Sequence, residues 1–276
     1  MSNNKYHCRI EKTFRDLKSS NKPALITFIT AGDPDLNNSR KILLNLPKAG
    51  ADIIEIGVPF TDPMADGPII QKSYKRALLK GINLDSVLKL VKIFRETNNY
   101  TPIVLMGYFN PIFQRGIKIF LNEAEKVGVD GLLIVDLPPE NDDEIREYLS
   151  ELNLKVIRLA TPTTNKSRIK KILKISSGFL YYVSITGITG TGLSKLSSLK
   201  QAYNNLKKHA KIPIVVGFGI NTPEKAKTVC KYADGVVVGS AIMNEMNKKI
   251  DKNNNINNNV INLVKKFSKA IKSARK

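Results

Sequence analysis

The hydrophobic positions of this chain fall into eight short runs rich in β-branched side chains, and a segment with helical spacing follows each run. Short apolar runs bounded by turn-forming residues are typical of strands buried on both faces of a parallel sheet. Eight such units in one uninterrupted series favour a closed barrel over an open sheet, so we predict an α/β fold, a (β/α)8 TIM barrel. The expected strands are 24–30, 52–57, 102–106, 131–136, 154–159, 179–184, 214–217 and 235–238, and the expected helices are 37–49, 84–97, 112–127, 140–152, 166–175, 197–209, 223–232 and the region from 241 onward.

Two further helices are expected outside the eight units, at 10–18 and at 260–273. Each carries an apolar stripe at helical spacing, so each is predicted to pack on the barrel, and the first to close its bottom. Segment 253–259 is interpreted as a polar connector, and the prediction is one barrel domain over 1–276. The two stripes are Ile10, Phe14 and Leu17, and Ile261, Val264, Phe267 and Ile271.

The chain has 276 residues and is 42% hydrophobic, which is enough to bury the core of one barrel. No apolar stretch approaches about 20 residues, and the first residues lack the apolar region of a secretory signal. We therefore expect a soluble protein that is not secreted, located in the cytoplasm or, if plastid-encoded, in the chloroplast or plastid stroma. Cys8 and Cys230 lie far apart without CxxC spacing, which argues against a zinc site or a disulfide framework.

The formal net charge of +20 suggests a nucleic-acid partner, but the distribution of the charge does not. Twelve of the twenty excess positive charges lie in residues 1–22 and 248–276, and no arginine–aromatic stripe or RNA-binding motif accompanies them. The Lys- and Asn-rich composition therefore indicates a solvated surface. Specific nucleic-acid binding stays the alternative, and a salt-dependent binding assay tests it.

Catalytic residues of such a barrel are expected at the carboxyl ends of the strands and in the loops that follow. The second unit places Glu55 near the end of its strand and Asp66 in the next loop, 58–68, which has eleven residues where about two to six are usual. Such a long loop points to binding or catalysis. Glu55 shares a strand face with Ile53 and Gly57, toward the barrel interior, where burial raises the pKa of a carboxyl group and lets it give and take protons.

Each of these acids also has a plainer interpretation. Glu55 could be neutralised by a buried lysine or by backbone donors. Asp66 could cap the helix that follows Gly67-Pro68, because an acid before Gly-Pro is an ordinary helix start. The position of either acid alone does not decide between these alternatives.

Glycine-rich loops follow the sixth, seventh and eighth predicted strands. They contain Gly190, Gly219 and Gly239, and Ser240 then begins a helix. Backbone N–H groups beside glycine and a helix N-terminus bind anions, so we predict that the substrate is a phosphate ester. None of the loops has GxGxxG spacing, which argues against a dinucleotide site. The alternative is that the glycines serve only tight turns.

Histidine chemistry is not expected, because His7 and His209 lie near a chain end and in a basic helix. No metal site is predicted. Lys155, near the fifth strand, is not excluded as a Schiff-base former. Acid–base catalysis by carboxyl groups on a phosphorylated small molecule is the reaction class that remains.

At these residues the sequence resembles the tryptophan synthase alpha chain family. The most specific match is Glu55-Ile-Gly-Val-Pro-Phe-Thr-Asp-Pro-Met-Ala-Asp-Gly-Pro68, whereas the phosphate loops alone fit several related barrels. Other matching stretches follow in family order along nearly the whole chain, at 28–34, 136–140, 161–164, 181–190, 217–220 and 239–241.

The resemblance implies a carbon–carbon lyase that cleaves indole-3-glycerol phosphate to indole and D-glyceraldehyde 3-phosphate. It also implies that Glu55 is the general acid and base, that Asp66 accepts the indole N–H, and that Tyr181 lies near Glu55. Many relatives carry Arg-Ala-Gly where this chain has Ile185-Thr186-Gly187. Further implied residues are Phe28 and Leu105 in the indole pocket, Gly190, Gly219, Gly239 and Ser240 at the phosphate, and Thr189 in a lid over Asp66.

The family further implies an α2β2 heterotetramer, in which a beta subunit with pyridoxal phosphate receives indole through a tunnel and makes L-tryptophan from L-serine. No cofactor is then expected in this chain. The rival interpretations are a phosphoribosylanthranilate isomerase-like or indole-glycerol-phosphate synthase-like barrel, which does not need the Glu-to-Asp segment, and a catalytically silent subunit, against which the intact acids speak. The residues that resemble interface positions of the family are Pro59, Asp62, Asn110 and Pro138.

Overall fold

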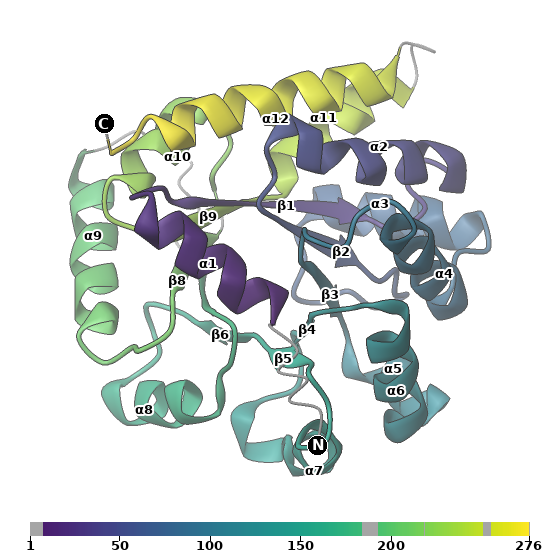
Figure 1. Cartoon of the computed structure of the whole chain (residues 1–276), viewed down its shortest axis with the longest axis horizontal. Helices are drawn as coiled ribbons and strands as arrows, with labels where there is room; N and C mark the ends of the chain where they lie inside the picture. The colour runs from purple at the N-terminus through teal and green to yellow at the C-terminus, as the bar shows by residue number, and fades with distance from the viewer. Residues whose placement is uncertain (1–7, 184–192, 218, 251–254, 276) are drawn as a thin grey trace, which may run out of the picture.

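A computed structural model of the chain describes residues 8–183, 193–217, 219–250 and 255–275. In these residues nine strands form one nearly closed sheet in which paired strands run parallel, in the order β5-β4-β3-β2-β1-β9-β8-β7-β6 (Figure 1). The predicted TIM barrel is confirmed. The strands are β1 (Ala24–Thr30), β2 (Ile53–Gly57), β3 (Ile103–Gly107), β4 (Gly131–Ile134), β5 (Lys155–Val156), β6 (Arg158–Ala160), β7 (Leu180–Val183), β8 (Ile214–Gly217) and β9 (Gly235–Val238).

The ninth strand arises because the predicted fifth strand is divided in two. β5 pairs with β4 and β6 pairs with β7, and Ile157 between them donates its N–H to the carbonyl of Leu132 in β4. The two pieces therefore occupy one position in the ring, at the place where the sheet closes on itself. The eight positions expected from the hydrophobic runs are all present.

Helices surround the strands, as Figure 1 shows, and their apolar faces pack on the barrel. Side-chain oxygens cap several of them; Asp35 accepts from the N–H of Asn38 at the start of α2, for example. The helices are α1 (Arg9–Ser19), α2 (Leu36–Ala49), α3 (Pro68–Leu79), α4 (Leu84–Arg95), α5 (Phe109–Arg115), α6 (Ile117–Val127), α7 (Asp143–Leu149), α8 (Lys166–Ile175), α9 (Leu193–Lys207), α10 (Pro223–Cys230), α11 (Ser240–Ile250) and α12 (Ile256–Lys272), with a 3-10 turn at Pro139–Asn141.

Three helices depart from the expectation, and one of them, α12, already begins at Ile256, within the segment 253–259 that was predicted to be a connector. The helix predicted at 112–127 is divided into α5 and α6 at Gly116, whose φ of +87° lies in a region that glycine adopts and a continuous helix does not. The second unit contains α3 ahead of α4, although no helix was predicted there beyond a start at Gly67-Pro68. None of the described helices is long and apolar enough to cross a membrane.

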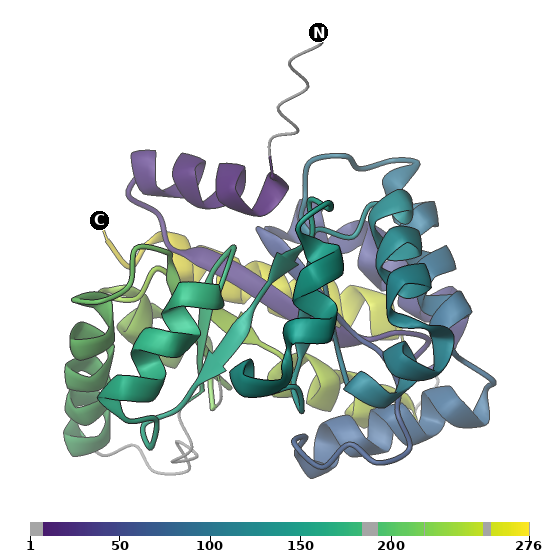
Figure 2. The same cartoon turned by 90° about the horizontal axis from the view of Figure 1, so that it is seen from below.

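Helix α1 lies across one end of the barrel (Figure 2). Ile10 comes close to Gly131 at the start of β4 and to Gly178 just before β7, and Phe14 contacts Phe179 with ring centroids 5.7 Å apart. Because Gly131, Gly178 and Phe179 lie at or just before the first residues of β4 and β7, α1 closes the amino-terminal end of the barrel, as predicted. The opposite end, where the strands finish, stays available for the loops that carry chemistry.

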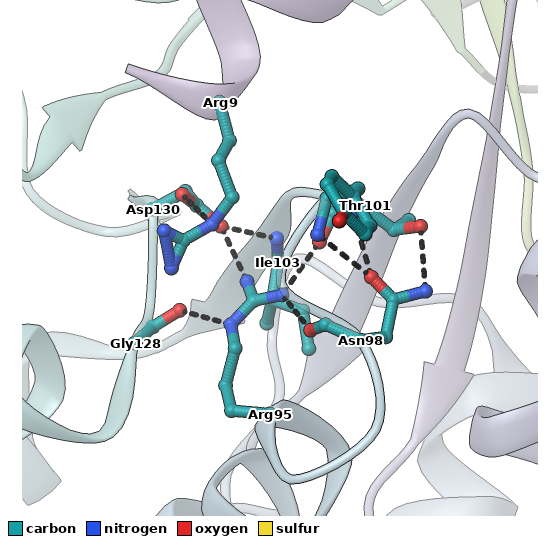
Figure 3. Close-up of polar contacts among 8 residues, drawn as sticks. Arg9, Arg95, Asn98, Thr101, Ile103, Gly128 and Asp130 are labelled. Carbon is teal, nitrogen blue, oxygen red and sulfur yellow. Dashed lines mark hydrogen bonds and ion pairs between the residues drawn. The ribbon is translucent and has the colours of Figure 1, made fainter. Parts of the chain in front are cut away.

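An ion-pair cluster fastens this closed end (Figure 3). Arg95 pairs with Asp130 at 2.7 Å, and the two side chains are only 9% and 6% exposed. Asp130 also pairs with Arg9 of α1 at 3.1 Å and accepts the N–H of Ile103. Arg95 donates in addition to the carbonyls of Asn98, Thr101 and Gly128. The cluster thereby ties α1, α4, β3 and the turn before β4 together.

Replacing Arg95 with Met is expected to lower the free energy of unfolding by about 3 kcal/mol, because it removes one partner of a buried ion pair and the donor to three carbonyls. Urea denaturation measures the loss. Lys12→Met is the matched control, since Lys12 pairs with Asp16 on the surface of α1; its unfolding midpoint should match that of the unsubstituted protein. Equal midpoints for all three proteins would contradict the assigned role of Arg95.

Candidate functional site

Glu55 lies in the middle of β2 with its side chain in the barrel interior. In the register it stands between Phe28 of β1 and Val104 of β3, and residues paired across a parallel sheet share a face. The residue is 1% exposed, and neither carboxyl oxygen has a hydrogen-bond partner among the described residues. Burial, and then the negative charge of Asp66, raise the pKa of Glu55 to about 8. Glu55 therefore holds a proton at neutral pH.

Asp66 lies in the loop between β2 and α3, and it does not cap α3. The N-cap of that helix is Gly67, which makes no side-chain bond, so the plainer interpretation of Asp66 is wrong. Its carboxylate instead accepts a hydrogen bond of 2.7 Å from the hydroxyl of Tyr108. Burial raises the pKa of Asp66, and the bond from Tyr108 opposes that rise. Asp66 is thus stabilised in its ionised form in a way that Glu55 is not.

Tyr108 is a site residue that sequence analysis missed. It follows the last residue of β3, so its place at the carboxyl end of a strand was the available signal. Its hydroxyl also accepts the N–H of Ala65 at 3.0 Å, and its ring stacks on Phe60 with centroids 5.1 Å apart. Tyr108 therefore fixes both the backbone and the carboxylate of the loop that carries Asp66.

Tyr181, in β7, faces the same interior. A Cβ atom at Gly217 of β8 would lie 2.2 Å from a ring carbon of Tyr181, so only glycine leaves room for the ring. Burial, and then Glu55 and Asp66, raise the pKa of its hydroxyl. The structure thus brings Tyr181 within electrostatic reach of both acids.

The predicted pocket residues Phe28 and Leu105 lie on different faces of the sheet. Phe28 shares the face of Glu55, and its ring comes within 2.6 Å of the place that a Cβ of Gly57 would occupy. Leu105 pairs with Ile56, so its side chain points to the helices. The interior position beside Gly57 belongs to Met106. The assignment of Leu105 to the pocket is one residue out of register, and in a strand such a step reverses the face.

The predicted phosphate ligands are described in part. Ser240 is the first residue of α11, and a Cβ at the preceding Gly239 would lie 3.1 Å from the Cβ of Phe28, so this helix start borders the pocket wall. Gly219 has a φ of +74°, which suits glycine. A helix N-terminus next to an acid–base pair is suited to hold an anionic group of a ligand. Thr189 and Gly190 lie outside the described residues.

The predicted partner positions lie in segments that follow strands β2, β3 and β4. Asp62 and Asn110 are exposed and Pro138 is half-buried. Pro59 is buried, because Val58 before it still bonds to Met106 and keeps the chain beside β3. Pro59 is therefore not available to a partner in this structure. Met64, in the same loop, is 80% exposed and was not predicted.

Within the described residues, no group of three His, Cys, Asp or Glu side chains could hold a metal ion. Lys155 pairs with Glu11 of α1 at 2.9 Å. That pair lies at the closed end of the barrel, away from the two acids, so the structure gives Lys155 no part in the site.

The chain is similar to one family model and to several proteins of known structure. The family model described as tryptophan synthase alpha chain matches residues 14–272. The crystal structure of tryptophan synthase subunit alpha from Legionella pneumophila str. Paris is 41% identical, with a TM-score of 0.91 over 96% of this chain and 98% of that one. A protein of Aquifex aeolicus VF5 is 34% identical, with a TM-score of 0.88 over 97% and 100%. Tryptophan synthase from M. tuberculosis in an open form is 27% identical, with a TM-score of 0.85 over 96% and 99%.

The buried carboxyl of Glu55 makes stability depend on pH. The unfolded chain loses this proton near pH 4.5 and the folded chain near pH 8, so the free energy of unfolding falls by about 1.4 kcal/mol per pH unit between these values. Glu55→Gln is expected to remove that fall. Denaturation curves of the two proteins should agree near pH 4 and diverge up to pH 8, with the variant more stable. Curves that stay parallel over this range, as is expected for the exposed control Glu151→Gln, would show that the pKa of Glu55 is not raised.

Proposed function

Because this chain belongs to the tryptophan synthase alpha chain family, a lyase family of tryptophan biosynthesis, we propose that it catalyses the α reaction. In this reaction a retro-aldol cleavage converts indole-3-glycerol phosphate to indole and D-glyceraldehyde 3-phosphate. The observation that carries the proposal is a buried Glu55 carboxyl without a hydrogen-bond partner among the described residues, within electrostatic reach of a hydrogen-bonded Asp66. Two carboxyl groups with different environments can act as acid and as anion at the same pH.

Glu55 performs the proton transfers. It gives its proton to C3 of the indole ring, which leaves the ring positively charged and able to accept electrons. The resulting carboxylate then removes the proton of the hydroxyl on the adjacent glycerol carbon. As that carbon becomes an aldehyde, the carbon–carbon bond breaks and its electron pair restores the neutral indole. A pKa of about 8 suits a group that must first give a proton and then take one near neutral pH.

Asp66 stabilises the charge on the ring. Its carboxylate accepts the indole N–H, so the positive charge that develops on protonation lies next to a fixed anion. Tyr108 supports this role, since the hydroxyl bonded to Asp66 favours the ionised carboxylate and holds it in place. Tyr181 lies close to Glu55 in the same interior.

The remaining pocket residues are assigned from their positions in the strand register and at the start of α11. Phe28 lies on the indole side, and Met106 takes the position that Leu105 was expected to hold. Phosphate binding is assigned to Gly239 and Ser240 at the start of α11, to Gly219 after β8, and to Gly190. Thr189 is assigned to a lid over Asp66.

The partner is proposed to be a beta subunit in an α2β2 heterotetramer. Pyridoxal phosphate belongs to that subunit, where it supports the synthesis of L-tryptophan from L-serine and the indole delivered by this chain. The contact surface is assigned to exposed residues of the segments after β2 and β3, Asp62, Met64 and Asn110, together with Pro138. The proposed compartment is the cytoplasm or a plastid stroma.

The chemistry is tested by measuring indole release from indole-3-glycerol phosphate. Glu55→Gln and Asp66→Asn are each expected to lose nearly all turnover, because one cannot exchange protons and the other cannot balance the ring charge. Glu151→Gln, an exposed change of the same type, should keep full turnover. Circular dichroism spectra should be the same for all variants. Substantial indole release by a folded variant would refute the role of the acid that it lacks.

The partner surface is tested by titrating a cognate beta subunit into the same assay. The isolated chain is expected to turn over weakly and to be strongly activated. Met64→Ser should require a higher concentration of beta subunit for half-maximal activation, because it removes an apolar contact from the loop of Asp66. Tyr100→Ser is the control, since Tyr100 is 85% exposed and precedes β3 at the opposite end of the barrel. An unchanged rate on adding beta subunit would count against the complex.

A further inference from the structure

Tyr74 projects from α3 toward the end of β2 and is completely buried. Its helix is firmly attached to the end of β1. Ser73 shares a hydrogen bond of 2.6 Å with Thr30, and Arg76 forms two bonds, of 2.7 and 2.8 Å, with the buried carboxylate of Asp33. These contacts on either side of Tyr74 restrict its movement, so the direction of its side chain is set by the fold.

The hydroxyl of Tyr74 reaches the interior face on which Glu55 lies. It is 2.9 Å from the place that a Cβ of Gly57 would occupy, and Phe28 borders the same point. Gly57 follows Glu55 by two residues and therefore shares its face of β2. The absence of a side chain at position 57 leaves the space into which this hydroxyl points.

Two buried polar groups with no partner thus face the same interior, and they interact electrostatically. Among the described residues the hydroxyl of Tyr74 has no hydrogen-bond partner, and neither has either carboxyl oxygen of Glu55. Buried polar groups are nearly always hydrogen-bonded in folded proteins, and exceptions call for an explanation. A donor and an acceptor left unpaired at one site do not serve the stability of the resting protein.

We propose that Tyr74 is a positioning residue whose hydroxyl donates a hydrogen bond to the carboxylate of Glu55 in the ionised state. The inference rests on the proposed function, in which Glu55 gives up its proton before taking one back. At that moment a full negative charge lies in a buried site, where it is costly without a donor. The two groups are not bonded in this structure, so the carboxylate side chain turns toward the hydroxyl when it ionises, and the proton of Tyr74 stays in place throughout.

The other titratable groups around Tyr74 and Glu55 are Asp66, Tyr108 and Tyr181. Asp66, from the loop, is an anion and opposes ionisation. Tyr108, at the end of β3, already donates to Asp66. Tyr181 reaches the site from β7 on a different part of the ring. The pKa of Tyr74 is raised well above 10 by burial and then by Asp66, Tyr108 and Glu55, so at neutral pH it is a donor to an anion and not an acid that ionises.

The test is Tyr74→Phe, which keeps the ring and removes only the hydroxyl. The pKa of Glu55 is measured in the full, unliganded chain by carbon-13 NMR of its side-chain carboxyl. Because the hydroxyl favours the ionised form, its loss should raise this pKa by about one unit. The pH at which kcat/KM falls on the alkaline side should rise with it, and kcat should drop more than KM changes.

Tyr232→Phe is the matched control. The hydroxyl of Tyr232 is also buried without a partner among the described residues, but its ring contacts Tyr203, away from the acids. The control should leave the pKa of Glu55 unchanged. The midpoint of unfolding of Tyr74→Phe should equal or exceed that of the unsubstituted protein, since an unpaired buried group has been removed.

One result would overturn the proposal, which is an unchanged pKa of Glu55 in Tyr74→Phe. If the unfolding midpoint of Tyr74→Phe also fell, the hydroxyl would be merely structural. Neither measurement requires turnover, so both stand apart from the proposed function, which fails if Glu55→Gln still releases indole.

Discussion

A carboxyl group moved from water into an apolar interior favours its neutral form, and the arrangement of Glu55 depends on this shift. Strands on both sides of β2 exclude water from the side chain, and in this structure no described residue donates a hydrogen bond to its carboxyl group. The closed barrel is therefore more than a support for the site. It sets the protonation state of one residue, and that state determines which reactions the site can perform.

The second acid shows how one loop can create the opposite condition a short distance away. Asp66 is also largely buried, but Tyr108 donates to its carboxylate and binds the backbone of the same loop. The two acids come from one strand–loop unit, and their difference comes from the next strand. Neither the chemistry of the residue type nor its depth explains the division of roles. Hydrogen bonding to the charged form explains it.

The hydrophobic runs were sufficient to predict every strand position, because a parallel strand buried on both faces is mostly apolar. They did not predict contacts that join distant parts of the chain. Tyr108 meets Asp66 across 42 residues, and Tyr74 reaches the end of β2 from a helix that the periodicity did not reveal. Leu105 was misplaced because two adjacent apolar residues are equivalent in sequence and only the register tells which faces inward. The two acids were thus found from the sequence, whereas the side chains that contact them from other elements were not.

The ion-pair cluster of Arg95 and Asp130 lies beneath α1, at the end of the barrel opposite to the two acids. This ion-pair cluster and the two acids consequently lie at opposite ends of the same barrel. Loops at the open end can accept new residues, and new substrates, while the base keeps the chain folded. The barrel can therefore acquire substitutions in these loops without unfolding. A library of variants made in the laboratory would best be confined to the open end.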